Sequence, residues 1–138
     1  MSTPEIRAVL DRSALESYAR GHVHVGELIQ EIAAEENAYV GIPAIALLEA
    51  QLRSADNKTA TTLLNFVAGL PTTMVLGLNG PDVPPTTQQV LLAGGDMARG
   101  HAIWAAMSHG AVCFTTEPQA FPAQVLPDQI ITIPADDA

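Results

Sequence analysis

The sequence contains few residues of several types, and each shortage excludes a class of protein. Its 138 residues include one cysteine, Cys113, so no disulfide can form within the chain and a disulfide-stapled scaffold is excluded. No run approaches the roughly 18 consecutive apolar residues of a membrane span. A secretory signal consists of a basic stretch followed by an apolar core, and the first residues of the chain do not show this pattern. The sequence therefore predicts a soluble, cytoplasmic protein that does not act in a membrane.

Basic and aromatic residues are also scarce. Six lysines and arginines stand against fifteen acids, giving a formal net charge of -9, and aromatics make up 4% of the chain. Nonspecific nucleic-acid binding depends on lysine and arginine neutralising phosphates, and single strands stack on aromatic side chains. Any function in nucleic-acid binding must therefore depend on a small basic patch or on bound cations.

Apolar residues, by contrast, are plentiful. They make up 48% of the chain, and the mean hydropathy is +0.21, so a disordered chain is excluded. A chain of this length buries roughly two thirds of its unfolded surface on folding. It is expected to form one domain over residues 1–138.

Strand and helix patterns alternate along the chain. The predicted strands span residues 6–10, 39–42, 72–78, 111–115 and 129–133. The predicted helices span residues 13–20, 25–33, 43–54, 57–69, 86–93 and 96–108, with Pro43 at the first position of the third. A loop is expected over residues 79–85, at most one helical turn between the last two strands, and a frayed tail over residues 135–138. The alternation predicts an α/β domain with a mostly parallel sheet.

Four of the acids are expected to face one crevice. Asp11 ends the first strand, and Glu117 lies just beyond the fourth. If these two strands are neighbours, both acids lie at the strand ends where ligands of parallel α/β sheets bind. Glu49 lies on the helix after the second strand, and Asp96 opens the helix before the fourth. Oxygen ligands of this kind favour Mg²⁺ or Mn²⁺. A carboxylate-held metal suits attack of water on a phosphodiester.

Each acid also has a simpler interpretation. Asp11 and Asp96 precede helices and can act as N-caps. Glu49 lies four residues before Arg53, a spacing at which the two can pair on one helix face. Glu117, in a loop, can be an ordinary surface residue.

The order of the motifs resembles the PIN domain, in particular the toxin ribonucleases of VapC type. The motifs that carry the resemblance are Val9-Leu10-Asp11-Arg12-Ser13-Ala14-Leu15, Ile42-Pro43 leading to Leu48-Glu49-Ala50, Asp96 with His101-Ala102 and Ala105-Ala106, His109-Gly110-Ala111, and Thr115-Thr116-Glu117-Pro118. The resemblance implies a three-layer fold with a five-stranded parallel sheet of order 3-2-1-4-5 flanked by helices. It further implies Mg²⁺- or Mn²⁺-dependent endonucleolytic cleavage of RNA, homodimers and inhibition by a small antitoxin protein.

The family's metal ligands map onto this chain with two departures. Asp11 matches the first acid, Glu49 the second, and Thr115 the threonine or serine that supports the last. The last acid is usually aspartate, and here it is Glu117. The slot of the third acid holds Arg99, so Asp96, one helical turn earlier, either substitutes for that acid or only caps the helix.

Two functions follow from this pattern. In the first, the protein is a ribonuclease toxin of a type II toxin–antitoxin pair, with Asp11, Glu49, Asp96 and Glu117 as its catalytic and metal-binding residues. Arg12, Arg53, Arg99 and Thr115 are then the candidate substrate-binding residues, although the arginines can equally be ion-pair partners of the acids. In the second, the protein is a catalytically decayed PIN-like module that acts through dimerisation or a protein partner.

Overall fold

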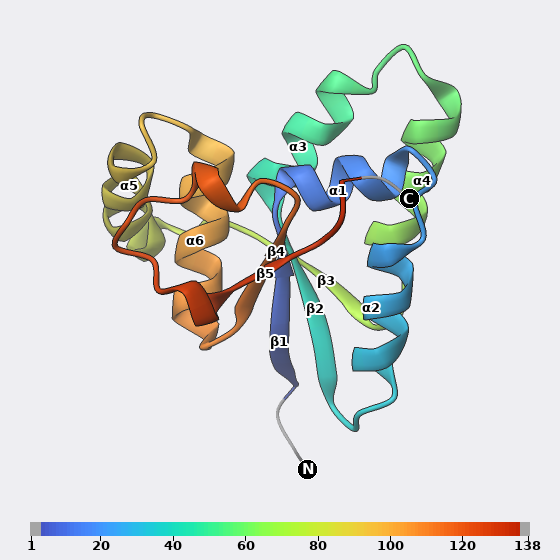
Figure 1. Ribbon diagram of the computed structural model, residues 1–138, viewed down its shortest axis with the longest axis horizontal. Coiled ribbons are helices and arrows are strands. Elements are labelled where there is room, and N and C mark those ends of the chain that lie inside the picture. The colour runs from blue at the N-terminus through green and yellow to red at the C-terminus, as the bar shows by residue number, and fades with distance from the viewer. Residues whose placement is uncertain (1–3, 136–138) are drawn as a thin grey trace.

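A single five-stranded sheet forms the centre of the molecule (Figure 1). The computed structural model describes residues 4–135. Its strands are β1 (Glu5–Leu10), β2 (Ala38–Pro43), β3 (Thr73–Leu76), β4 (Val112–Thr115) and β5 (Ile130–Thr132). All neighbouring strands are parallel and their order is β3-β2-β1-β4-β5, which confirms the order that the resemblance implies.

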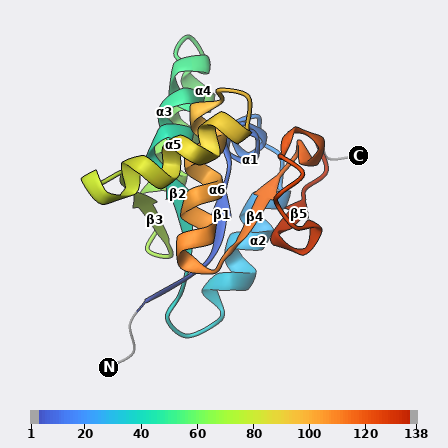
Figure 2. The ribbon, with the colours of Figure 1, turned by 90° about the vertical axis from the view of Figure 1, so that its left-hand side faces the viewer.

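Helices cover both faces of the sheet, so the fold has three layers. The helices are α1 (Arg12–Ala19), α2 (His24–Ala33), α3 (Ala44–Arg53), α4 (Lys58–Ala68), α5 (Val83–Leu92) and α6 (Met97–His109). Helices α1, α2 and α4 lie on one side of the sheet, and α5 and α6 on the other (Figures 1 and 2). Within the described residues, no helix is long and apolar enough to cross a membrane.

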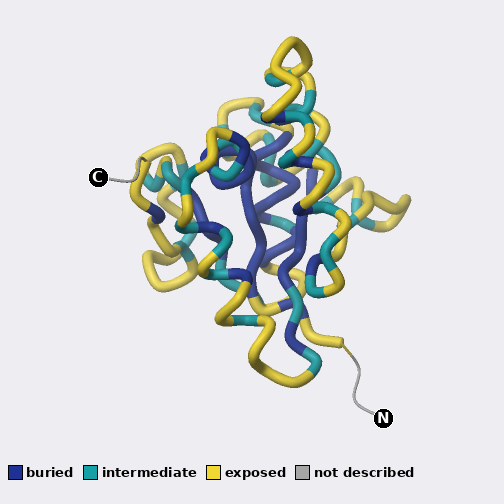
Figure 3. Tube along the Cα trace, turned by 90° about the vertical axis from the view of Figure 1, so that its right-hand side faces the viewer, coloured by how far each residue is buried: buried dark blue, intermediate teal, exposed yellow. Residues whose placement is uncertain are grey.

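The central strand β1 contributes to both cores. Ala8 and Leu10 pack into the larger core with α1, α2 and α4, whereas Ile6 and Val9 pack into a smaller one with α6. The central strands are accordingly the most continuously buried part of the chain (Figure 3). This burial on both faces explains why the segment is a short, mostly apolar run rather than an alternating one.

Local residue chemistry fixes several helix ends. The side chains of Asp11, Asn57 and Asp96 each accept a hydrogen bond from a backbone N–H in the first turn of α1, α4 and α6. Gly110 ends α6 in the left-handed conformation, with φ of 62°, which glycine adopts without a steric penalty. The N-cap roles considered for Asp11 and Asp96 are therefore confirmed.

Prolines account for two of the differences from the predicted elements. Pro43 is the last residue of β2 and the N-cap of α3, not its first helical residue, because its ψ of 131° is extended. The loop predicted over residues 79–85 ends early, since α5 begins at Val83 and takes Pro84 and Pro85 into its first turn. The first helical turn tolerates proline because its N–H groups have no partner within the helix.

Other differences occur in the edge strand β3 and in the segment before the edge strand β5. Strand β3 has four residues instead of the predicted seven. Between β4 and β5 the chain forms two 3₁₀ turns, Pro118–Ala120 and Pro127–Gln129, where at most one helical turn was predicted. Of the tail predicted to be frayed, residues 136–138 lie outside the described residues.

Candidate functional site

The carboxyl ends of β1 and β4 bring two of the predicted acids together. Strand order reverses between these neighbouring strands, which pair Leu10 with Phe114. The backbone N–H of Asp11 continues the pairing by donating to the carbonyl of Phe114 at 3.2 Å. Asp11 and Glu117 therefore meet at the switch point, where ligands of open α/β sheets bind.

Asp11 makes different contacts with its two oxygens. Oδ1 accepts hydrogen bonds from the Ala14 N–H at 2.9 Å and from the Ser13 hydroxyl at 2.7 Å. Oδ2 accepts one from Nη1 of Arg99 at 3.1 Å. The Asp11 side chain is 2% exposed, so one carboxylate caps α1 and forms a buried ion pair.

A chain of hydroxyl groups joins Asp11 to the backbone of Glu117. The Glu117 N–H donates to Thr115 Oγ1 at 2.9 Å, and Thr115 Oγ1 lies 3.1 Å from Ser13 Oγ, which donates to Asp11. Ser13 Oγ also accepts from the Thr116 N–H at 2.9 Å. Thr115 is fully buried, and its hydroxyl positions the backbone of Glu117.

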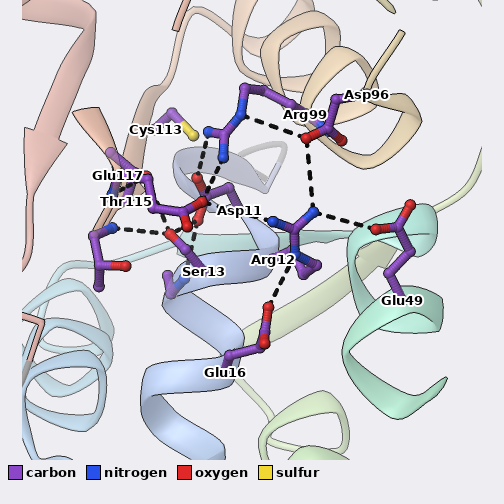
Figure 4. Close-up of polar contacts among 12 residues, drawn as sticks. Asp11, Arg12, Ser13, Glu16, Glu49, Asp96, Arg99, Cys113, Thr115 and Glu117 are labelled. Atoms are coloured by element: carbon purple, nitrogen blue, oxygen red, sulfur yellow. Dashed lines mark hydrogen bonds and ion pairs between the residues drawn. The ribbon is translucent and has the colours of Figure 1, made fainter. Parts of the chain in front are cut away.

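Arg99 lies inside the group of acids (Figure 4). Its Nη2 donates to Glu117 Oε1 at 2.7 Å, and its Nε lies 3.8 Å from Asp96 Oδ2. Its guanidinium carbon lies 4.9 Å from the centre of the Phe121 ring, a cation–π distance. With 4% of its side chain exposed, Arg99 is a fixed part of the interior and not a surface arginine.

Arg12 lies in the same group of acids, on the side of Glu16 and Glu49 (Figure 4). Its guanidinium donates to Glu16 at 2.9 Å and to Glu49 at 3.2 Å, and lies within 3.7 Å of Asp96 and Glu117. Burial lowers the pKa of Arg12, but the hydrogen bond to Glu16 and the charges of Asp96, Glu16 and Glu117 outweigh it, so the pKa is raised. Arg12 therefore stays charged.

All four predicted acids thus lie around two guanidinium groups. Glu49 pairs with Arg12, whereas Arg53, considered as its partner, lies 3.5 Å from Glu16. We define the acid–arginine cluster as the seven charged residues in contact here together with the more exposed Arg53. Its members are Asp11, Arg12, Glu16, Glu49, Arg53, Asp96, Arg99 and Glu117.

The acid–arginine cluster is not arranged to hold the divalent metal that the resemblance implies. Carboxylate oxygens are suitable ligands for Mg²⁺ or Mn²⁺, but each of the four predicted ligands already has a guanidinium nitrogen within 3.8 Å. A divalent cation among them would be repelled by both arginines. In the described part of the chain, no three or more Asp, Glu, His or Cys side chains are placed to hold one metal ion. The residues as arranged do not fit the metal.

Sequence reasoning missed three residues of the site. Ser13 was given no role beyond its place in the first motif, but it links Asp11 to the loop that follows β4. Glu16 lies four residues after Arg12, a spacing that signals a helical ion pair. Phe121 covers Arg99 from a loop, and no local pattern indicates that contact.

Two further titratable groups, Cys113 and His101, are buried. Burial, and secondarily the charge of Asp11, raises the pKa of the Cys113 thiol well above its usual value, although Arg99 opposes this shift, so the thiol stays protonated and unreactive. Burial lowers the pKa of His101, despite opposing effects of a backbone hydrogen bond with Gly77 and the charge of Asp82. His101 is therefore a neutral core residue of α6, with Nδ1 3.5 Å from the Ile45 N–H.

Comparison with known proteins supports the fold. No protein-family model matches the chain, and no curated protein sequence does. Among solved structures, the chain is similar to PAE2754 from Pyrobaculum aerophilum, with a TM-score of 0.57 and 18% identity over 83% of this chain and 77% of that one. It is also similar to a chain of VapBC2 from Rickettsia felis, solved with a DNA fragment from their promoter, with a TM-score of 0.62 and 15% identity over 93% and 97% of the two chains. The protein therefore has the PIN-like fold that its sequence motifs imply.

Proposed function

We propose that this protein is a PIN-fold partner-binding protein of toxin–antitoxin type that does not hydrolyse RNA through a bound metal. One observation carries the proposal: the guanidinium groups of Arg99 and Arg12 pair with all four acids that would otherwise hold the ion. The buried carboxylate of Asp11 needs a compensating charge, and the guanidinium of Arg99 supplies it.

The charge of the surface supports the same conclusion. Three of the five arginines, Arg12, Arg53 and Arg99, are engaged with acids of the cluster, and Arg7 pairs with Glu5 and Glu35. With a net charge of -9, the chain lacks the excess of basic groups on which nonspecific affinity for phosphates depends.

The partner proposed is a small antitoxin-type protein. The similar chain of the Rickettsia felis structure belongs to a VapBC2 complex bound to promoter DNA. On the present chain, Leu48 and Leu52 lie one turn apart on α3, beside Glu49, and are 58% and 66% exposed. A contiguous exposed apolar patch marks a protein contact surface, and we propose that these two leucines are part of one. Self-association as a homodimer remains a prediction.

A second candidate function is the metal-dependent ribonuclease. The observation that favours it is the convergence of Asp11, Glu49, Asp96 and Glu117 at the switch point of a VapC-like fold. This candidate takes Mg²⁺ or Mn²⁺ as cofactor and RNA as substrate. Because it uses all four acids, it requires Arg99 to leave Asp11 and Glu117 and Arg12 to leave Glu49 first.

An RNA-cleavage assay separates the two candidates. The wild-type protein and its Asp11→Asn variant are incubated with a panel of RNAs and millimolar Mn²⁺ or Mg²⁺, and the products are resolved by electrophoresis. The proposal expects no cleavage above background from either protein. Mn²⁺-dependent cleavage by the wild type that disappears in Asp11→Asn would overturn it and establish the ribonuclease. Thermal unfolding of the variant without metal checks that it is folded.

The partner is tested separately. An open reading frame next to this gene that encodes a small DNA-binding protein is co-expressed with the tagged chain. The proposal expects the two proteins to co-purify, and expects Leu52→Glu to weaken the complex at least tenfold. If the protein from the neighbouring reading frame binds the variant as tightly as the wild type, α3 is not part of the interface.

A further inference from the structure

We propose that Arg99 takes the place of a divalent cation in the acid–arginine cluster and is the residue that prevents the pocket from binding one. This inference rests on the proposed function, because it concerns the same pocket and assigns its closure to a single side chain. Its consequence is that removal of Arg99 converts the pocket into a Mn²⁺ or Mg²⁺ site.

The position of Arg99 is fixed from both ends. Its backbone N–H donates to the Asp96 side chain that caps α6, at 3.0 Å, so the root of the side chain is held in the first helical turn. At the other end, its guanidinium contacts Asp11 and Glu117 and lies beside the Phe121 ring. The Arg99 side chain cannot leave the carboxylates without breaking its contacts with Asp11, Glu117 and Phe121.

Arg99 bridges the same acids that a metal would. It contacts the carboxylate that follows β1 and the one that follows β4, at 3.1 and 2.7 Å, and it lies 3.8 Å from Asp96. A metal ion likewise joins oxygen ligands that come from separate elements. Arg12 lies farther from these acids than Arg99 does from Asp11 and Glu117: it is 3.7 Å from Asp96 and 3.6 Å from Glu117, and its two shortest contacts are to Glu16 and Glu49.

Without Arg99, the negative charges of the neighbouring carboxylates are no longer neutralised. Asp11, with 2% of its side chain exposed, loses its ion-pair partner, while Glu117 and Asp96 remain nearby. Carboxylates that crowd together either take up protons or bind a cation. Oxygen donors of this kind suit Mg²⁺ or Mn²⁺, and deletion of the guanidinium creates space for the ion. Because no three acids of the described residues are now placed to hold one ion, the ion has to draw Asp11, Asp96 and Glu117 together into that space.

The test measures Mn²⁺ binding directly. Arg99→Gln and Arg99→Ala are compared with the wild type and with Arg7→Gln, a matched substitution whose ion pairs lie at Glu5 and Glu35, outside the cluster. The midpoint of thermal unfolding is followed as MnCl₂ is titrated, and bound Mn²⁺ is measured from the loss of the free-ion signal in electron paramagnetic resonance. A double variant, Arg99→Gln with Asp11→Asn, locates the ion.

The inference expects both Arg99 variants to bind Mn²⁺ and to gain about 5 °C or more in Tm when Mn²⁺ is 100-fold above its Kd. The wild type and Arg7→Gln are expected to show no shift, and the double variant to lose most of the gain. An Arg99 variant that folds only when Mn²⁺ is present also supports the inference.

Failure of this inference and failure of the proposed function give different results. Arg99 variants that bind no Mn²⁺, beside a wild type that also binds none, overturn the inference and leave the proposed function in place. A gain that persists in the double variant also overturns it, because the ion then lies elsewhere. Wild-type protein that binds Mn²⁺ as tightly as the variants overturns both.

Discussion

The two partners of the buried ion pair between Arg99 and Asp11 are expected to differ in how much free energy of unfolding is lost when each is substituted. Replacing Arg99 with methionine keeps most of the aliphatic stem beside Phe121 but leaves Asp11, with 2% of its side chain exposed, as an unpaired buried charge. Removal of one partner of a buried pair costs about 3–5 kcal/mol. Replacing Asp11 with asparagine keeps an oxygen that can cap α1 and leaves Arg99 paired with Glu117 at 2.7 Å. The expected cost is therefore about 1–3 kcal/mol, the value of a charged hydrogen bond.

The double variant tests the reasoning. Because Arg99→Met harms the protein chiefly by stranding the Asp11 charge, neutralising Asp11 in the same chain should recover part of the loss. The two costs are then expected to be non-additive by about 1–3 kcal/mol. Urea unfolding followed by circular dichroism gives the four free energies of unfolding. A cost for Arg99→Met below that of Asp11→Asn, or additive costs, would show that Asp11 does not depend on Arg99.

Three further outcomes are expected elsewhere in the molecule. Glu49→Gln should cost no more than about 1 kcal/mol in urea unfolding, because its ion pair with Arg12 is partly exposed; a loss as large as that of Arg99→Met would contradict this. Gly100→Ala should cost about 1–3 kcal/mol by overpacking, since an added Cβ would lie 2.6 Å from the Val90 nitrogen; unchanged stability would mean that α5 moves freely on α6. Because burial lowers the pKa of His101, its contribution to stability is fully present above the unfolded pKa of about 6.5. That contribution is lost as the pH falls from there toward the folded pKa, by at most about 1.4 kcal/mol per pH unit. Urea midpoints at pH 7.5 and 5 should therefore differ less in His101→Asn than in the wild type, and equal differences would contradict the assignment.

Most of the fold could be predicted because its signals are local. Asn57, Asp96 and Gly110 mark helix ends through contacts within four residues of themselves, and apolar runs mark the strands. The start of α5 was predicted wrongly because proline was taken as a breaker, although the first turn of a helix accepts it. A proline lies in a first helical turn rather than a loop only when a helix follows it. Pro84 and Pro85 do not themselves show whether one does.

The contents of the site were harder to predict than its position. The strand-end rule correctly places Asp11 beside Glu117, because it depends only on topology. The ion pairs depend on tertiary packing: Arg99 reaches Asp11 across 88 residues and Arg12 reaches Glu49 across 37. Arg12 follows Asp11 directly, but consecutive residues at a helix start point in different directions. The sequence left open whether the arginines hold phosphates or acids, and no local pattern decides between these roles.

Two guanidinium groups and one divalent cation carry the same total charge, but they neutralise a carboxylate pocket differently. An arginine belongs to the chain, so its charge arrives whenever the protein folds and does not depend on the concentration of an ion. Its planar donors satisfy several carboxylate oxygens at once, as Arg99 does between Asp11 and Glu117. A metal additionally offers open coordination positions to water or phosphate, whereas the guanidinium groups of Arg12 and Arg99 are already used by acids of this chain. The same acids can therefore hold the fold together without forming a hydrolytic centre.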